Sequence, residues 1–587
     1  MKSKNRLLAM LLAAAMMFAL LAGCNGTGQG DESQAPTGGG SSAPSQTPEE
    51  TNPTVPAGDK TLKLYVAGFQ NLDPQIWSWG THVDRMGIFE GLTILSPDFT
   101  TRLADAESLE HNGDYTVWTA TLRQDLKWSD GTPLDANDYM YSFERIIDPQ
   151  YLQGKTSAFV TNPPILNALE CQKGEVGFDQ VGIKMLDNYT IEFTLDTACT
   201  DFDVRLAESW GLPVPRHAIE QYGDDWTKPE NIVVNGPYIP TAREEDVHLT
   251  LGPNANYYET PALERIDIYA GTQNQLLAYQ NGDINVATLT AADIDGVNAD
   301  PELSGQVQVF DTSVLSYLGL LKGTNDILQR NPKIRQAISL SIDRETIATA
   351  VNKNTVTAAQ SLVYPGFASW ANDLGIIDYN VKRAQQLMEE AGYPNGEGLG
   401  TMTLLMSGTP GADTLAIADM ITKGTGIKVQ IVNLEWAAFV ADRDAYHEDD
   451  MWGIYVDAWN TSVANVAGGF SNYQFDIRTG NLDAAGMKAF SEAARAVAGE
   501  EAARQTCTNE TAIAYAEQYE KLLKESDPDI INKGYKELEI MRLEDASSIP
   551  LWWGKTTLLV QSSIQGYEGN PLLLNSPPLY FKDITNG

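Results

Sequence analysis

The sequence predicts a mixed α/β protein built from several lobes, and three observations lead to this fold class. The chain has 587 residues, which is too many for a single hydrophobic core. Alternating apolar and polar residues in the first half predict strands, whereas the second half mixes apolar strands with amphipathic helices. No short internal repeat is visible, which argues against a solenoid. We therefore expect an α/β or α+β assembly of two or more domains.

The first half of the chain is rich in predicted strands. Residues 60-KTLKLYVA-67 alternate and then become apolar, which is typical of an opening strand. A second strand is predicted within 115-YTVWTATLRQDLKW-128, and a hairpin is predicted over 181-VGIKMLDNYTIEFTL-195. Between them, Asp135 is a candidate N-cap for a helix over residues 136–147, whose apolar residues recur at helical spacing.

The second half predicts helices that alternate with strands. Residues 333–351 have the pattern of one long amphipathic helix, and residues 379–392 that of another, which ends at a glycine. A buried strand is predicted at 401–406, a helix at 413–426 and a further strand at 427–434. This order predicts a βαβ unit with a parallel pair of strands.

The first residues predict export. A basic start precedes an apolar run from residue 7 to residue 22, which is short for a membrane-spanning helix and fits the core of a signal peptide. The run ends in 21-LAGC-24, which resembles the lipobox of bacterial lipoproteins. That resemblance implies that residues 1–23 are a lipoprotein signal peptide and that Cys24 carries lipid. We therefore expect a protein anchored at the extracytoplasmic face of the bacterial cell membrane.

Composition separates a linker from the folded body and excludes one class of partner. Residues 24–59 comprise the cysteine expected to carry lipid and a stretch of Gly, Ser, Thr, Pro, Gln and acidic residues. Such a stretch cannot bury enough apolar surface to fold, so we expect a flexible linker. The formal net charge is −38 at pH 7, which argues against nucleic acid as a partner.

Cysteine and histidine usage predicts neither a disulfide framework nor a metal site. Besides Cys24 the chain has Cys171, Cys199 and Cys507, and an odd number of cysteines in an exported chain allows one disulfide at most. Cys171 and Cys199 are the nearer pair, and whether they are bridged stays open. No C-x-x-C occurs and the histidines are scattered singly, so we expect no metal and no cofactor.

The sequence carries no complete catalytic motif. It has no G-x-S-x-G, the nucleophile elbow of α/β-hydrolases. Residues 447-HEDDM-451 begin like a zinc protease motif but lack its second histidine. A pair of carboxylates for glycoside hydrolysis stays open, because such residues can lie far apart in the sequence. We expect no enzymatic activity, with an exported hydrolase as a minor alternative.

Several short motifs follow one another in an order that is typical of one protein family. The most specific is 122-LRQDLKWSDGTPLDANDYMYSFERIIDP-149. The others are 72-LDPQ-75, 88-IFEGL-92, 182-GIKMLDNYTIEFTL-195, 212-LPVPRHAIEQYG-223, 235-NGPY-238, 335-RQAISLSIDRE-345, 383-RAQQLMEEAGYPNG-396 and 549-IPLWW-553. From about residue 62 onward the chain therefore resembles the extracytoplasmic solute-binding proteins of ABC importers, specifically the oligopeptide/dipeptide-binding class (family 5). Members of this family have no enzymatic activity of their own.

The resemblance implies a fold like that of the periplasmic binding proteins, with two halves that close on a hinge over a ligand. Three lobes are expected. Lobe I would comprise residues 60–90, 212–316 and 549–587, lobe II residues 91–211, and lobe III residues 317–548. The two crossovers between lobes I and III would form the hinge. The family usually holds an extended peptide through main-chain hydrogen bonds, as an added strand would be held.

The resemblance also implies a ligand anchor. Residues 453-GIYVD-457 match a family segment whose aspartate pairs with the α-ammonium group of the ligand, which assigns that role to Asp457. The backbone of Gly453 and Tyr455 would then bond to the peptide. Asp457 lies among apolar residues, where an unpaired carboxylate is costly. Two structural alternatives stay open: a cap at the end of a strand, or one half of an internal ion pair.

Four further residues are candidates for the ligand site. Residues 435-EWAAFVADR-443 resemble the family, which makes Trp436 a candidate pocket wall and Arg443 a candidate cleft charge. Trp436 could equally belong to the core, and Arg443 could be a surface charge on its helix. Trp77 and Trp79 could line the cleft or cover lobe I.

The expected function is capture of (oligo)peptides and their delivery to a membrane permease with its ATPase. We expect a monomer that is held at the membrane by its N-terminal lipid. Two alternatives within the same fold stay open. One is a different cargo, such as an oligosaccharide, because the 12 tryptophans offer rings that stack on sugars. The other is a surface sensor without transport.

Overall fold

The structure is a computed structural model, and it describes residues 60–66, 68, 69, 72–76, 84–152, 164–271, 274–460, 466, 510–522, 525–569 and 580–587. These residues belong to one compact unit. The predicted signal peptide, the linker, Cys24, Trp77, Trp79 and Cys507 lie outside the described residues.

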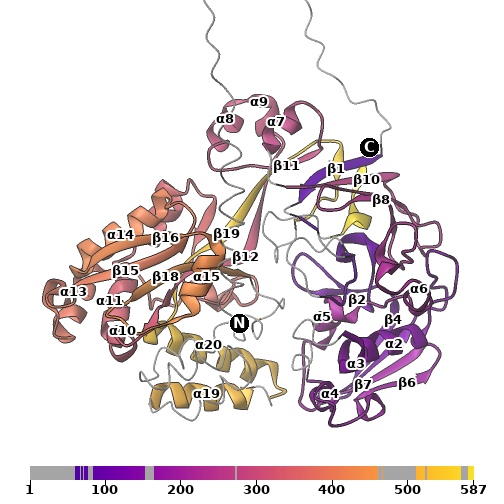
Figure 1. Cartoon of the computed structure of the whole chain (residues 1–587), viewed down its shortest axis with the longest axis horizontal. Helices are drawn as coiled ribbons and strands as arrows, with labels where there is room; N and C mark the ends of the chain where they lie inside the picture. Colours follow the sequence, from indigo (N-terminus) through magenta and orange to yellow (C-terminus); the bar gives the residue numbers. More distant parts are fainter. Residues whose placement is uncertain are drawn as a thin grey trace, which may run out of the picture. The chain divides into compact units, whose positions relative to one another are not determined.

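An 11-stranded mixed sheet is the main element of the unit (Figure 1). Its strand order is β16-β15-β18-β12-β19-β11-β1-β10-β9-β8, and β14 also pairs with β19. The strands are β1 Thr61–Val66, β8 Tyr238–Glu244, β9 His248–Pro253, β10 Arg265–Ala270, β11 Val286–Thr288, β12 Val307–Leu320, β14 Val356–Ala358, β15 Thr401–Ser407, β16 Lys428–Leu434, β18 Gly453–Asn460 and β19 Ile549–Val560. The long strands β12 and β19 pair with each other and join the β8–β11 side of the sheet to the β15–β18 side.

Smaller sheets complete the β structure. A four-stranded sheet has the order β4-β5-β7-β6, and three further pairs are β2–β3, β13–β17 and β20–β21. Their strands are β2 Thr93–Leu95, β3 Thr101–Leu103, β4 Ala106–His111, β5 Val117–Leu122, β6 Ile183–Asp187, β7 Thr190–Thr194, β13 Lys322–Gly323, β17 Tyr446–His447, β20 Ile564–Gln565 and β21 Thr585–Asn586. The predicted strands at 60–67 and 115–128 are confirmed as β1 and β5, and the predicted hairpin as β6–β7.

Helices pack on these sheets. They are α2 Ala136–Ile147, α3 Pro149–Leu152, α4 Ala168–Gln172, α5 Phe202–Leu206, α6 Arg216–Tyr222, α7 Gln275–Gln280, α8 Ile294–Ala299, α9 Pro301–Ser304, α10 Ile327–Arg330, α11 Pro332–Ser341, α12 Arg344–Thr346, α13 Val381–Glu390, α14 Ala412–Thr425, α15 Trp436–Asp444, α19 Glu510–Leu522 and α20 Pro528–Asp545. Within the described residues, none of them is both long and apolar enough to cross a membrane. The predicted βαβ unit is confirmed, because β15 and β16 are parallel and α14 connects them.

The predicted N-cap of α2 is confirmed. The Asp135 side chain accepts the backbone N–H of Asn137 at 2.8 Å, and Asp138 in turn accepts the backbone N–H of Asp135 at 3.1 Å. These reciprocal bonds form a capping box, which satisfies donors that the first turn of a helix leaves free.

The prediction of a single helix over residues 333–351 is wrong. α11 ends at Ser341, the backbone of Ile342 is extended, and α12 begins at Arg344. Asp343 explains the break, because its side chain accepts the backbone N–H of Thr346 at 3.0 Å and so caps a new helix. The helical periodicity of the apolar residues continues across this break, which is why the sequence pattern did not reveal it.

The apolar core is divided among separate clusters. The first cluster joins β1 and β8–β11 to the four-stranded sheet and α2, and it includes Phe581 near the C-terminus. The second cluster packs α11, α13 and α14 onto one face of β15 and β18, where Ile454 lies. The third cluster contains Tyr455, on the opposite face of β18, because successive side chains of a strand alternate between faces. The third cluster consists of Leu315, Tyr317, Leu321, Ala359, Leu362, Tyr364, Ile377, Leu405, Phe439, Tyr455, Leu543 and Trp553. The boundaries of lobes I, II and III stay a prediction.

The two described cysteines are free. Cys171 and Cys199 are both buried thiols, so the disulfide that the sequence left open is not formed between them. Burial raises the pKa of the Cys171 thiol to about 11, which keeps this group protonated at neutral pH.

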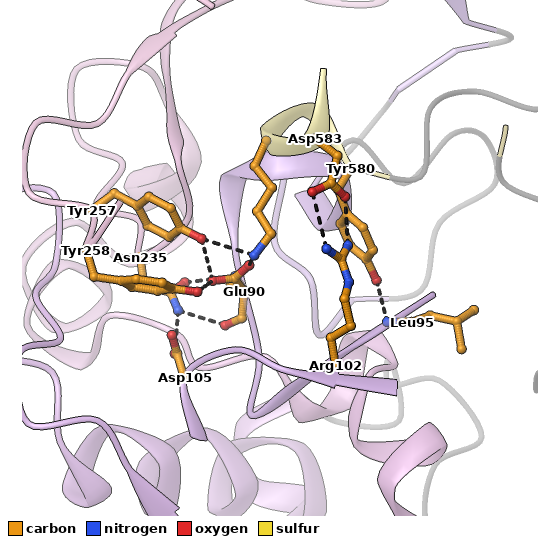
Figure 2. Close-up of polar contacts among 10 residues, drawn as sticks. Glu90, Leu95, Arg102, Asp105, Asn235, Tyr257, Tyr258, Tyr580 and Asp583 are labelled. Atoms are coloured by element: carbon orange, nitrogen blue, oxygen red, sulfur yellow. Dashed lines mark hydrogen bonds and ion pairs between the residues drawn. The ribbon is translucent and has the colours of Figure 1, made fainter. Parts of the chain in front are cut away.

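Residues from distant motifs meet in a buried polar network around Glu90 (Figure 2). Glu90 forms an ion pair with Lys582, close to the C-terminus. Its Oε2 atom also accepts the hydroxyl groups of Tyr257 and Tyr258, at 2.8 and 2.6 Å. These bonds tie the 88–92 motif to the β9–β10 connection and to the end of the chain.

Asp105 lies at the buried end of this network. Its Oδ2 atom accepts hydrogen bonds from Asn235 Nδ2 and from the Tyr139 hydroxyl, both at 2.8 Å. Burial, and then the charge of Glu90, raise the pKa of Asp105 well above its ordinary value. Its other oxygen, Oδ1, is buried and has no hydrogen-bond partner within the described part of the chain.

Replacing Asp105 should change how stability depends on pH. Because the folded state raises the pKa of Asp105, ionising this group destabilises the folded protein progressively as pH rises above about 4, the ordinary value for aspartate. Asp105→Asn keeps a side-chain oxygen that can accept both hydrogen bonds and removes the ionisation. The free energy of unfolding of this variant, relative to that of the wild type, should therefore increase as pH rises above about 4 in urea titrations.

Asp98→Asn is the matched control. Asp98 is exposed, and hydrogen bonds from Thr100 lower its pKa. Its ionised form therefore stabilises the folded state, so the stability of this variant relative to the wild type should fall as pH rises toward about 4 and should stay constant above that. A pH-independent difference between Asp105→Asn and the wild type would contradict the interpretation.

Candidate ligand-binding site

The candidate site lies where β18 loses one of its two neighbouring strands. β18 pairs in parallel with β15 from Thr403↔Gly453 to Leu405↔Tyr455. On its other side β18 pairs in antiparallel fashion with β12, and this pairing continues to Val314↔Asn460. Among the residues that the structure describes, β18 therefore has a strand on one side only after Tyr455.

The backbone groups of β18 are divided between its two sides. The Gly453 carbonyl accepts the N–H of Leu321 at 3.0 Å, which directs the backbone of Gly453 toward β12. Alternation along an antiparallel pair directs the backbone of Tyr455 and Asp457 the same way, and that of Val456 and Ala458 toward the open side. The predicted contact of the Gly453 and Tyr455 backbone with a ligand stays a prediction.

Asp457 and Arg443 form a buried ion pair. The Arg443 Nη1 atom donates to Asp457 Oδ2, and the two side chains are 8% and 5% exposed. Asp457 Oδ1 accepts the backbone N–H of Ala458 at 2.8 Å. Two of the predicted site residues are thus brought together, in the arrangement that the sequence left open as an internal ion pair.

Asp444 completes this charge cluster, and sequence reasoning missed it. Arg443 Nε donates to Asp444 Oδ1 at 2.9 Å, and Nη2 donates to Oδ2 at 3.3 Å. Among the described residues, one guanidinium thus faces two carboxylates, so Arg443, Asp444 and Asp457 form one charge cluster. Asp444 is the last residue of α15, where the helix dipole disfavours an acid, and this position could have signalled that a cation lies close by.

Arg443 is held in its charged form. Burial favours the neutral form of the guanidinium, but the hydrogen bonds to Asp444 and the charge of Asp457 outweigh burial and raise the pKa of Arg443. The guanidinium carbon also lies 5.6 Å from the ring centre of Phe439 and 6.0 Å from that of Tyr455, which is within range of cation–π attraction.

The ring of Tyr455 lies against the backbone of β12. A Cβ atom added to Gly319 would come within 2.2 Å of Tyr455 Cζ, so only glycine leaves room for the ring there. Tyr317 lies beside it, with ring centres 6.1 Å apart in an edge-to-face arrangement. Tyr455 is therefore fixed on the same face of β18 as Asp457.

Two tryptophans near the cluster are exposed. Trp436 begins α15 and is 52% exposed, with its ring 5.7 Å from that of Phe439. Trp459 lies on the part of β18 that has one open side, and it is 39% exposed. This exposure excludes Trp436 from the core, so that of its two predicted roles the pocket wall stays a prediction.

Arg443 should matter more for stability than Asp457. Arg443→Met would leave the buried carboxylate of Asp457 without its cation, and breaking a buried pair in this way costs about 3–5 kcal/mol. Asp457→Asn leaves Arg443 paired with Asp444 and should cost less, about 1–2 kcal/mol. Urea unfolding followed by tryptophan fluorescence would measure both losses.

Arg383→Met is the matched control for Arg443→Met. Arg383 pairs with Glu390 at 2.7 Å, but both side chains are more than 40% exposed. Removing an exposed pair should change the free energy of unfolding by less than about 1 kcal/mol. Equal losses for the two arginine variants would show that the Arg443 cluster contributes nothing beyond a surface pair.

Comparison with known proteins identifies the family of this chain. The sequence model of the bacterial extracellular solute-binding proteins, family 5 (middle region), matches residues 101–481. The periplasmic oligopeptide-binding protein OppA of Escherichia coli is 28% identical over 376 residues, which cover 61% of this chain and 67% of OppA. The dipeptide-binding protein DppE of Bacillus subtilis is 26% identical over 419 residues, which cover 66% of this chain and 74% of DppE.

Comparison of structures confirms the predicted fold class. The Escherichia coli murein tripeptide-binding protein MppA superposes with a TM-score of 0.68, over 91% of this chain and 99% of MppA. The two sequences are 22% identical, so this likeness concerns the fold alone. The family model spans more than half of the chain and confirms the family that the motifs predicted. This protein belongs to the bacterial extracellular solute-binding proteins of family 5.

Proposed function

We propose that this protein captures peptides at the open side of β18 and delivers them to the permease and ATPase of an ABC importer. The observation that carries the proposal is the end of the β15 pairing at Tyr455, which leaves Val456–Trp459 with one free side within the described residues. An extended peptide can bind there as an added strand, through main-chain groups that every peptide has. The names of the oligopeptide-binding protein OppA and the dipeptide-binding protein DppE agree with this proposal.

The charge cluster supplies an anchor next to the open side. We propose that Asp457 receives the α-ammonium group of the peptide. An ionised carboxylate offers about four acceptor positions, and Arg443 and Ala458 occupy one each. The carboxylate of Asp457 attracts an added cation, and low solvent exposure strengthens that attraction. Trp436 and Trp459 would provide apolar walls.

The wider organisation of the protein belongs to the same proposal. Lobes I, II and III would follow the predicted boundaries, and the separation of the first cluster from the second and third supports the division of lobe III from the other two. β12 and β19 would form the hinge, because they join the two sides of the main sheet. The protein would act as a monomer, without cofactor or catalysis, and would be anchored through a lipid on Cys24.

Identifying the bound ligand tests the proposed cargo. Native mass spectrometry of protein purified without denaturation should find a mixture of short peptides, since main-chain binding discriminates little between side chains. A single saccharide mass would instead establish the alternative in which the exposed tryptophan rings stack on a sugar.

The role of Asp457 can be tested separately with a matched pair of peptides. Asp457→Asn should weaken binding of a free-amine peptide by more than about tenfold, or about 1.4 kcal/mol, because the ion pair with the ammonium is lost. The N-acetylated form of the same peptide should be affected much less. Isothermal titration calorimetry would measure both affinities.

Asp444→Asn is the control for the charge of the cluster. It removes the same charge but lies on α15, and so it should not distinguish free-amine from acetylated peptides. If Asp457→Asn weakened binding of both peptides equally, the role of Asp457 would be structural. That result would reject the ammonium contact without rejecting a peptide as the cargo.

A further inference from the structure

The tip of the β2–β3 hairpin extends from one hydrophobic cluster to another. Leu92 and Ala106, on either side of the hairpin, belong to the first cluster, whereas Phe99 at its tip packs against the third. The ring centre of Phe99 lies 4.8 Å from that of Phe367 and 5.8 Å from that of Tyr364, both edge-to-face. Tyr364 in turn lies 5.2 Å from Trp553. We call Tyr364, Phe367 and Trp553 the aromatic socket.

The strands of the hairpin are tied to elements of the first cluster. The backbone N–H of Leu95 donates to the Tyr580 hydroxyl at 2.8 Å, and Arg102 pairs with Asp583 at 2.7 Å (Figure 2). The Thr101 hydroxyl donates to the Asp203 carboxylate, at 2.6 Å, on α5. The hairpin is therefore anchored along its strands as far as the last pair before the turn, and its tip is the part that reaches the socket.

Phe99 adopts a backbone conformation that is unfavourable for a bulky residue. Its φ angle is +65°, in the left-handed region, where the Cβ atom crowds the backbone. The tight turn requires this conformation, because Phe99 N–H donates to the Ser96 carbonyl at 2.9 Å and Ser96 N–H donates to Thr100 at 2.7 Å. Glycine or asparagine would fit this turn with less strain, so the turn alone does not account for a phenylalanine. Contact of its ring with the socket does.

The socket side of the contact is equally specific. Gly366 lies between the two ring-bearing residues Tyr364 and Phe367, and a Cβ atom added there would come within 2.9 Å of Phe99 Cε2 and 2.5 Å of Tyr364 Cε1. A side chain at this position would displace the ring of Phe99 or that of Tyr364. Phe99 and Gly366, which are far apart in the sequence, thus meet at a single contact.

The socket lies on the same face of the main sheet as the candidate ligand site. Trp553 on β19 is in register with Leu315 on β12, and Leu315 is in register with Trp459 on β18. Asp457 is two residues from Trp459, so its side chain projects from the same face. With strands about 4.8 Å apart and a rise of about 3.3 Å per residue, the Cα atoms of Asp457 and Trp553 are about 12 Å apart.

We propose that Phe99 is a latch and a positioning residue for ligand capture. Its insertion into the aromatic socket holds the first cluster against the third and stabilises the closed arrangement of the protein before any ligand binds. The link to ligand capture rests on the proposed function, whereas the latch itself does not. The contact between Phe99 and the socket would then exist before a ligand binds. The strength of this contact would determine the equilibrium between the open and closed arrangements of the protein.

Phe99→Gly tests the latch directly. Glycine adopts φ of +65° without strain, so this variant keeps the turn and removes only the ring. Loss of the edge-to-face contacts should shift the equilibrium toward the open form by about twofold to tenfold for each ring contact. Small-angle X-ray scattering of the ligand-free protein should therefore give a larger radius of gyration, and stopped-flow binding should give faster ligand dissociation.

Gly366→Ala provides the same test from the other side of the contact. It should reproduce the effect of Phe99→Gly, and the double variant should open no further than either single variant, because both remove one interaction. Phe99→Tyr keeps the ring and should behave like the wild type. Leu186→Ala, at a 55% exposed residue on β6, should change nothing.

Two results would overturn the latch. One is an unchanged radius of gyration in both Phe99→Gly and Gly366→Ala, with far-UV circular dichroism confirming that they fold. The other is additive opening in the double variant. Since scattering is measured without ligand, the latch is tested even if the protein binds no peptide. Failure of peptide binding with a changed radius of gyration would reject the proposed function alone.

Discussion

The antiparallel pairing of β12 with β18 and β19 determines where the strand residues of the candidate site lie. β12 is held between these two strands, and its register places Tyr317 opposite Asp457 and Leu315 opposite both Trp459 and Trp553. A shift of one residue would move the carboxylate of Asp457 to the face that packs against α11, α13 and α14. Because that face is apolar, the register is fixed by burial as well as by hydrogen bonds.

This register creates an electrostatic requirement that the chain meets from a neighbouring helix. Asp457 is brought into a nearly buried position, where an unpaired carboxylate would be strongly unfavourable. α15 supplies Arg443, but it also brings Asp444, so the guanidinium is shared by two acids. Apolar residues at positions 443 and 457 together would pack there at similar or lower cost, since replacing a whole buried ion pair by apolar residues is often neutral or stabilising. Folding alone therefore does not require this pair, which agrees with the ligand contact that we propose for Asp457.

Local patterns in the sequence predicted local structure well and long-range contacts poorly. The cap at Asp135, the β6–β7 hairpin and the βαβ unit depend on residues close together in the chain, and these predictions are confirmed. The break at Asp343 was missed because a capping side chain can interrupt an apolar pattern without changing its period. The pair of Arg443 and Asp457 was foreseen only as two separate candidates. The Glu90 network, which joins residues 90 and 582, has no signal in any single segment.

The Arg443 cluster and the Phe99 turn have one physical property in common. Each contains an unfavourable local feature, a buried carboxylate in one case and a left-handed aromatic residue in the other, that a group from another part of the chain or a ligand can offset. Such features make the stability of the protein depend on how its segments are arranged. A purely apolar contact has this effect to a much smaller degree. A ligand can shift an equilibrium between two arrangements only by its difference in affinity for them. A binding protein therefore gains from having charge and strain at the contacts that open and close.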